Sequence, residues 1–95
     1  MKTEYQYKII TNLKKAREKA GYSQAEIAKL LEISTGQLGN IESYKQPHKY
    51  TLTQIVKICD LLKINIENVF FHESVNKKIT NRMIIDKIIE YQHQK

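Results

Sequence analysis

Uncharged polar side chains are concentrated between residues 34 and 43, in the run STGQLGNIES. The amide groups of Asn and Gln can donate and accept hydrogen bonds together, so each can pair with the edge of an adenine base. A threonine methyl group can contact the methyl group of thymine. We therefore predict that three residues of this run contact bases of duplex DNA, with a preference for A·T pairs: Thr35, Gln37 and Asn40.

Two short helices joined by a tight turn are predicted to carry these residues. Ser23 with Glu26, and Ser34 with Gln37, form capping boxes, in which the two side chains satisfy backbone amides at a helix start. Apolar residues at helical spacing follow each box: Ile27, Ala28, Leu30 and Leu31 in the first helix, and Leu38 and Ile41 in the second. This pattern is typical of a helix-turn-helix whose second helix enters the major groove.

At this point the sequence resembles the helix-turn-helix of phage repressor and Cro-type regulators, also called Xre-like regulators. The resemblance covers roughly Ile9 to Phe71. The landmarks, in order, are Gln24, Ala28, Ile33-Ser34, Leu38, Ile41, Glu42, Pro47, a helix from Thr51, and the run NIENVF at residues 65–70. The resemblance implies an all-α fold, with a five-helix repressor-like DNA-binding domain. It also implies a dimer that binds a palindromic operator, with repression as the default mode of regulation.

The chain departs from this family at two places. Glu32 occupies the turn position that is usually glycine, and a left-handed conformation there would cost about 1 kcal/mol. Gly36 and Gly39 stand where the family often has charged or long polar residues. Glycine lets the backbone approach another surface closely, although each one weakens a short helix by about 1 kcal/mol relative to alanine.

Phosphate contacts are expected to position the domain on DNA. The predicted contacts are Gln24, Ser34, Ser43, Tyr44, Lys45 and Lys49, with His48 as a further candidate. Two of the DNA-facing assignments have a structural alternative. Gln37 is also the capping partner of Ser34, and Gln24 stands at a helix start where polar residues are common.

An ion pair between Arg17 and Glu42 is implied by the resemblance, because the family commonly has an Arg–Glu pair at these places. It would join the first helix to the end of the recognition helix. The alternative is two exposed charges that contribute little to stability.

The remaining helices follow from local signals. A first helix is expected from about Tyr7 to Ala20, after a polar arm at residues 1–6, with Gly21 as its C-terminal cap. Thr51 with Gln54 opens a helix to about Leu62, and Asn65 caps a short fifth helix. We expect a domain at residues 1–72, followed by a polar connection at residues 72–78 and a last helix over 80–92 within a segment at 73–95.

The last helix has an apolar stripe that must be covered. Its members are Ile84, Ile85, Ile88 and Ile89. Either the chain's own domain or a second chain could cover them, and the second case predicts a homodimer built on this segment.

Composition limits the other functions. The 95 residues carry a net charge of +6, which suits a polyanionic partner, but the basic residues are spread along the chain. The single cysteine, Cys59, lies on an apolar helical face and is expected to be a buried thiol, in keeping with a reducing cytoplasm. No apolar run is long enough for a membrane span. There is no metal-ligand spacing and no glycine-rich phosphate loop, so we expect no enzyme, cofactor, metal site or small-molecule substrate.

One alternative belongs to another functional class. A protein-interaction module, such as an antitoxin that binds a toxin, could keep this fold without DNA affinity. Affinity for DNA falls steeply with salt, whereas affinity for a protein partner falls less. RNA binding is disfavoured, since Tyr44 and Tyr50 alone do not provide a stacking surface.

Overall fold

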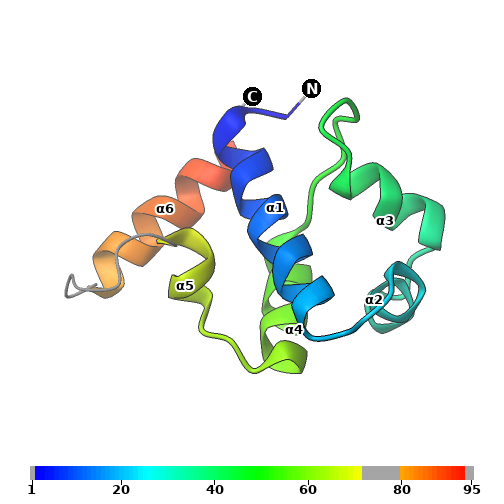
Figure 1. Cartoon of the computed structure of the whole chain (residues 1–95). Helices are drawn as coiled ribbons and strands as arrows, with labels where there is room; N and C mark the ends of the chain where they lie inside the picture. The colour runs from blue at the N-terminus through cyan, green and yellow to red at the C-terminus, as the bar shows by residue number, and fades with distance from the viewer. Residues whose placement is uncertain (1, 72–79, 94–95) are drawn as a thin grey trace.

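The computed structural model describes residues 2–71 and 80–93, and helices are the only regular elements within them (Figure 1). Their bounds are α1 (Glu4–Lys19), α2 (Gln24–Leu31), α3 (Thr35–Glu42), α4 (Leu52–Leu62), α5 (Ile66–Phe70) and α6 (Asn81–His93). The predicted all-α class, with a helix-turn-helix and an added C-terminal helix, is confirmed. The predicted connection at residues 72–78, and with it the boundary between the two predicted segments, lies outside the described residues.

Capping boxes start four of these helices. The three predicted boxes, at Ser23, Ser34 and Thr51, are formed by reciprocal hydrogen bonds. A fourth box joins Thr3 to Gln6, so α1 begins at Glu4 and the prediction of a polar arm at residues 1–6 is wrong. The T-x-x-Q pattern at Thr3 carries the same signal as the other boxes. Asn65 holds the N-cap position of α5, but its side chain makes no capping hydrogen bond.

Left-handed residues end three of the helices. Gly21, with φ of 85°, follows Ala20 at the end of α1, and the amide of Tyr22 donates to the carbonyl oxygen of Arg17 at 3.1 Å. Glu32 adopts φ of 59° in the turn between α2 and α3, as expected, and Lys63 adopts φ of 56° after α4. The three turns take three or four residues each, and the one at Glu32 allows α2 to pack on α3.

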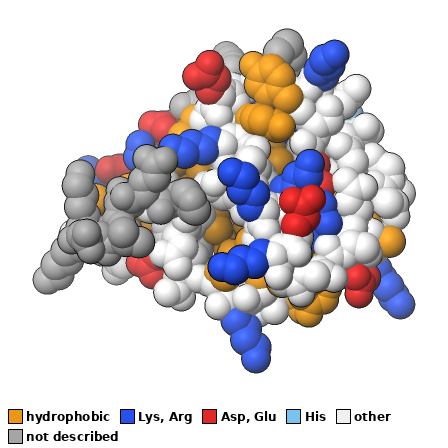
Figure 2. Space-filling model, in the orientation of Figure 1, with side chains coloured by type: hydrophobic (Ala, Val, Ile, Leu, Met, Phe, Trp, Pro, Cys, Tyr) orange, Lys and Arg blue, Asp and Glu red, His pale blue; other side chains and the backbone are white. Residues whose placement is uncertain are grey.

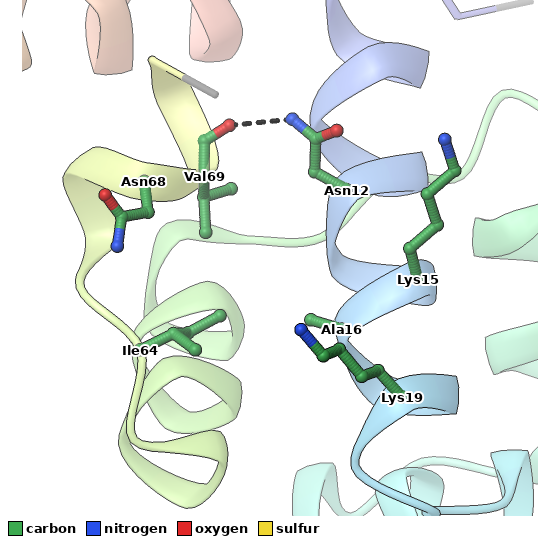
Figure 3. Close-up of a pocket in the computed structure, with 7 residues that line it drawn as sticks. All are labelled: Asn12, Lys15, Ala16, Lys19, Ile64, Asn68 and Val69. Carbon is green, nitrogen blue, oxygen red and sulfur yellow. Dashed lines mark hydrogen bonds between the residues drawn. The ribbon is translucent and has the colours of Figure 1, made fainter. Parts of the chain in front are cut away.

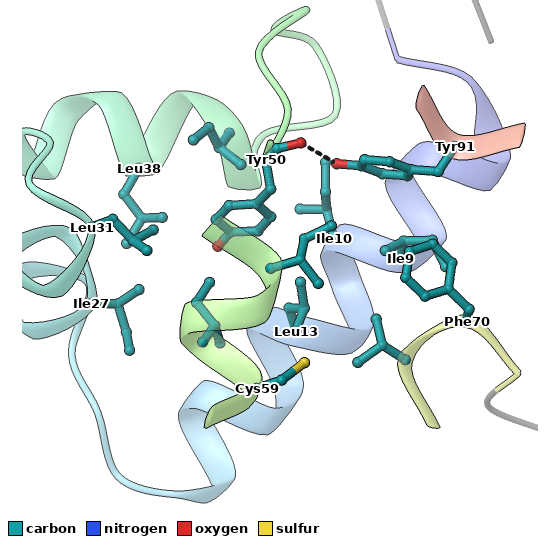
Figure 4. Packing of buried hydrophobic residues seen from close by; sticks show 14 of the residues in the cluster. Ile9, Ile10, Leu13, Ile27, Leu31, Leu38, Tyr50, Cys59, Phe70 and Tyr91 are labelled. Atoms are coloured by element: carbon teal, nitrogen blue, oxygen red, sulfur yellow. Dashed lines mark hydrogen bonds between the residues drawn. The ribbon is translucent and has the colours of Figure 1, made fainter. Parts of the chain in front are cut away.

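The apolar core is built around α1, which lies between the α2–α3 pair and α5 (Figures 1 and 4). Each helix contributes buried side chains, among them Ile9, Ile10 and Leu13 of α1, Ile27 of α2, Leu38 of α3, Ile55 and Ile58 of α4, Phe70 of α5 and Tyr91 of α6. Cys59 is buried in this core, and burial raises the pKa of its thiol to about 11. The predicted buried thiol is therefore confirmed, and it stays protonated at neutral pH.

The C-terminal end of α6 belongs to the same core. The Tyr91 hydroxyl donates to the carbonyl oxygen of Tyr50 at 3.0 Å, and its ring meets Phe70 edge-on with centroids 6.0 Å apart. The Gln6 side chain donates to the carbonyl oxygen of Tyr91 at 2.9 Å. Ile88 packs against the core, whereas Ile85 is 54% exposed and Ile89 47% exposed. The chain's own domain therefore covers only part of the apolar stripe of α6.

None of the helices in the described part of the chain is both long and apolar enough to span a membrane.

The left-handed turn at Glu32 leads to a stability prediction. Glu32→Gly should raise the free energy of unfolding by about 1 kcal/mol in urea denaturation, because glycine adopts positive φ without steric cost. Lys57→Gly is the matched control: Lys57 is exposed within α4, where glycine should lower stability by about 1 kcal/mol. Equal destabilisation by both substitutions would show that the turn holds no strain.

Candidate nucleic-acid interface

The outward face of α3 carries the three predicted base-contacting residues. Thr35, Gln37 and Asn40 are exposed, while Leu38 and Ile41 are buried against the rest of the domain. Helical spacing explains this division, since residues three apart share one face. All three predicted residues are thus accessible to solvent: Gln37 and Asn40, three apart, share a face, whereas Thr35 projects from a different side of the helix.

Gly36 and Gly39 leave part of this face without side chains. A Cβ atom added at Gly39 would meet no heavy atom within 4 Å, and one added at Gly36 would lie 3.9 Å from the Ser34 hydroxyl oxygen. Packing within the chain therefore does not require glycine at either position. The backbone of α3 is open here to close approach by another surface.

Gln37 uses its side-chain carbonyl oxygen in the cap of α3. Its Oε1 accepts from the Ser34 amide at 2.8 Å, and the Gln37 amide donates to the Ser34 hydroxyl oxygen at 3.0 Å. The NH₂ group of Gln37 stays available to donate to DNA, whereas its Oε1 already accepts one hydrogen bond. A bidentate contact with adenine would require the same Oε1 to accept a second hydrogen bond.

A buried ion pair holds the end of α3 against α1. Arg17 Nε lies 3.0 Å from Glu42 Oε2, and Arg17 Nη2 lies 3.0 Å from Glu42 Oε1, so the contact is bidentate. The two side chains are only 8% and 3% exposed. Arg17 Nη1 also donates to the carbonyl oxygen of Tyr22 at 2.8 Å. The pair implied by the resemblance is thus present, and it reaches the segment before α2 as well as α3.

Gln24 belongs to the same network. Its Nε2 donates to Glu42 Oε1 at 2.8 Å, so the first residue of α2 is tied to the last residue of α3. In the free protein the Gln24 side chain therefore has a structural partner that the sequence analysis did not predict, and its phosphate contact stays a prediction. A contact from this side chain to phosphate would share its NH₂ group with Glu42.

Three of the other predicted phosphate contacts follow α3 directly. Ser43 is the C-cap residue of α3, and Lys45 is exposed in the loop. Tyr44 is 40% exposed, and its ring meets Tyr7 of α1 edge-on with centroids 4.9 Å apart. Ser34 lies at the other end of α3, where its hydroxyl group forms the N-cap.

Lys49, another predicted phosphate contact, reaches the C-terminal end of α6 in the free protein. Its ammonium donates to the carbonyl oxygens of Tyr91 and Gln92, at 3.4 and 3.2 Å, and lies 5.5 Å from the centroid of the Tyr91 ring. Carbonyl groups at a helix C-terminus attract cations, which explains this placement. In the free protein Lys49 therefore holds the end of α6, and its predicted phosphate contact stays a prediction.

Lys2 contacts the end of α3 and the following loop, and no sequence pattern predicts these contacts. It is 4% exposed, and its ammonium donates to the carbonyl oxygens of Asn40 at 3.3 Å, of Gln46 at 2.6 Å, and of Ser43. Burial lowers the pKa of this ammonium from its ordinary value. The partners lie 38 to 44 residues away in the sequence, so no local pattern could have predicted the contacts.

A groove on the side of α1 that faces α5 is separate from α3 (Figure 3). It has a volume of about 430 Å³, and the Asn12 side chain bridges it by donating to the carbonyl oxygen of Val69 at 2.9 Å. Lys15 and Lys19 of α1 also line it. None of the predicted DNA-contacting residues lines this groove.

Basic side chains do not form one continuous patch on the face shown in Figure 2, where they are spread out and lie among acidic ones. In the described part of the chain, no three His, Cys, Asp or Glu side chains gather as a metal site would require. Glu42 is the one charged residue of α3 and is buried, so the exposed surface of α3 carries hydrogen-bonding groups without charge.

Comparison with known proteins points to the same segment. A family model described as helix-turn-helix matches residues 13–68, which include both α2 and α3. The chain is also similar to the HTH-type transcriptional regulator ImmR of Bacillus subtilis (strain 168), with 35% identity over 83 residues. This match covers 82% of the chain and 63% of the length of that relative. No solved structure gives a significant match.

Removing one partner of the buried ion pair should be costly. We expect Arg17→Met and Glu42→Gln each to lower the free energy of unfolding by about 3–5 kcal/mol, because the remaining charged or polar group loses its buried partner. The double variant should lose less than the sum of the two. Urea denaturation measures all three.

The exposed pair of Lys87 with Glu90, 3.7 Å apart on α6, provides the control. Lys87→Met should change stability by less than about 1 kcal/mol. Additive losses at residues 17 and 42 would contradict the coupling seen in the structure.

Proposed function

Since this chain belongs to the Xre-like helix-turn-helix family, we propose that it is a sequence-specific DNA-binding transcriptional regulator. The observation that carries the proposal is the α3 surface, where Thr35, Gln37 and Asn40 are exposed beside an open backbone. The relative is longer than the region matched, so the activity of the whole protein is part of the proposal. Repression by blocking polymerase access, in the cytoplasm, is the simplest mode of action.

Base reading in this proposal depends chiefly on Thr35 and Asn40. Asn40 can bond adenine through both the oxygen and the NH₂ group of its side-chain amide, and the Thr35 methyl group can contact thymine. Gln37 contributes its NH₂ group, because its oxygen caps α3. Gly36 and Gly39 allow the DNA to approach α3 closely.

Phosphate contacts would flank this face. Lys45, Tyr44 and Ser43 follow α3, while Ser34 precedes it and Gln24 begins α2. The amide groups of the first turn of α2 point toward its N-terminus and favour an anion there. This set would fix the register of α3 in the groove without reading sequence.

A homodimer on a palindromic operator completes the proposal. Ile85 and Ile89 are one turn apart on α6 and exposed, so they form an apolar ridge that a second copy of the chain could cover. Ile84 and Ile88 are half-buried beside the ridge. The two recognition helices of such a dimer would enter grooves about 34 Å apart.

A protein-interaction function remains the second candidate. The observation that favours it is the scattered basic charge of the face in Figure 2, which provides little general attraction for DNA. Selection of binding sites from a random duplex pool at near-physiological salt distinguishes the two functions. Enrichment of an inverted repeat supports the regulator, whereas binding only at low salt supports a protein partner.

Substitutions on α3 and in the following loop should have different effects. Asn40→Ala should weaken binding to the selected duplex by about 5- to 150-fold and relax specificity at one base pair. Lys45→Met should weaken binding to all sequences. It should also make the salt slope, the slope of log affinity against log salt concentration, less steep by about 0.9. Fluorescence anisotropy across a salt series measures both effects.

Lys57→Met is the control, since Lys57 is exposed on α4 and outside the proposed interface. It should leave both affinity and slope nearly unchanged. Equal loss of affinity for all three variants would argue against a specific α3 interface.

Charge on the α6 ridge should separate the dimer. We expect the double variant Ile85→Asp with Ile89→Asp to be monomeric by light scattering, because two carboxylates cannot be buried unpaired against a second chain. Tyr91 is untouched, so circular dichroism should show an unchanged fold. Deletion of residues 79–95 is a poorer test, because it would remove Tyr91 from the core.

Asn81→Asp with Gln92→Asp is the matched control, since it adds the same charge at exposed positions of α6. This control should remain dimeric. A monomeric wild-type chain at micromolar concentration, or a dimeric ridge variant, would overturn the proposed α6 interface.

A further inference from the structure

The C-terminal end of α3 lacks a cation of its own. The last turn of this helix contains no basic residue. Carbonyl groups at a helix C-terminus carry partial negative charge and have no partner within the helix. A helix that must be placed accurately against another surface would gain from a donor at this end.

Lys2 supplies this donor from the other end of the sequence. Its ammonium bonds the carbonyl oxygen of Asn40 in the last turn of α3, and those of Ser43 and Gln46 in the loop that follows. An ammonium has three N–H donors, and three carbonyl groups receive them. Lys2 therefore differs from Lys45, whose side chain is exposed.

The backbone that carries Lys2 is itself fixed. Thr3 forms the N-cap of α1, and Gln6 joins that cap and also donates to the carbonyl oxygen of Tyr91. The edge-on contact of Tyr7 with Tyr44 holds the same loop against α1. The start of α1 thus acts as a support for the loop after α3.

We propose that Lys2 is a positioning residue for DNA recognition, which fixes the end of α3 and the loop of residues 43–46 before DNA binds. This inference rests on the proposed function. Ser43, Tyr44 and Lys45, three of the proposed phosphate contacts, lie within that loop. Ordering the loop in the free protein removes a cost that would otherwise be met on binding.

Lys2→Met tests the role, since methionine keeps an unbranched apolar side chain but has no donors. Lys2→Arg keeps charge and donors, Lys8→Met changes an exposed lysine of α1, and Lys45→Met is the reference for a phosphate contact. Two readouts are needed: amide hydrogen exchange at residues 40–46 without DNA, and affinity for the selected duplex across a salt series. Exchange at Ile58, in the buried core, reports global unfolding.

We expect Lys2→Met to speed exchange at residues 43–46 while Ile58 stays protected, and to weaken DNA binding at least fivefold with an unchanged salt slope. Lys2→Arg should restore most of the affinity, and Lys8→Met should resemble the wild type. Lys45→Met should reduce the slope by about 0.9 without changing exchange.

Three results would overturn the role. Unchanged exchange and affinity in Lys2→Met would show that the contacts do not order the loop. A slope reduced by about 0.9 would identify Lys2 as a phosphate ligand instead. Faster exchange at Ile58 to the same extent as at residues 43–46 would make Lys2 a general stabiliser. If the wild-type chain binds no duplex, the proposed function fails, and exchange alone still decides whether Lys2 orders the loop.

Discussion

The placement of α3 depends on the buried ion pair between Arg17 and Glu42. Two charges removed from water are tolerated only when their geometry is good and their remaining groups are hydrogen-bonded, as Tyr22 and Gln24 provide here. Any rotation of α3 would separate these groups within the protein interior. The pair therefore restricts the recognition helix to one orientation relative to α1 and α2. This restriction matters because α3 is short and contains two glycines, so its own propensity contributes little.

A second set of contacts restrains the loop after α3. Lys2 holds the first part of this loop, and Tyr50 at its end accepts a hydrogen bond from Tyr91 of α6. Lys49 donates in turn to the end of α6. The loop proposed to contact phosphate therefore lies between the start of α1 and the helix proposed to form the dimer. These few contacts tie the loop after α3 to the C-terminal end of α6.

Local signals in the sequence predicted the parts of the fold that depend on neighbouring residues. The boxes at Ser23, Ser34 and Thr51, and the left-handed Glu32, all involve residues within one turn. The predicted start of α1 at about Tyr7 is too late, because the apolar pattern begins only at Ile9 whereas the T-x-x-Q signal begins at Thr3. The contacts of Lys2 and Lys49 join residues about 40 apart, and no periodicity encodes them. For the same reason the sequence predicts the apolar stripe on α6, but not which of its residues the domain covers and which stay exposed.

The outward face of α3 carries few hydrogen-bonding side chains, whereas many contacts fix this helix to the rest of the domain. With glycine at two outward positions and the Gln37 oxygen used in a cap, few side-chain groups remain for base reading. In the proposed complex each remaining group must then meet its base with good geometry, because a hydrogen bond weakens steeply when it is misaligned. Glycine allows the close approach that short side chains such as Thr35 and Asn40 need in order to reach base edges. The contacts that fix α3 and its small number of outward side chains therefore belong together in the proposed function: accurate placement of α3 compensates for the few base contacts that it can make.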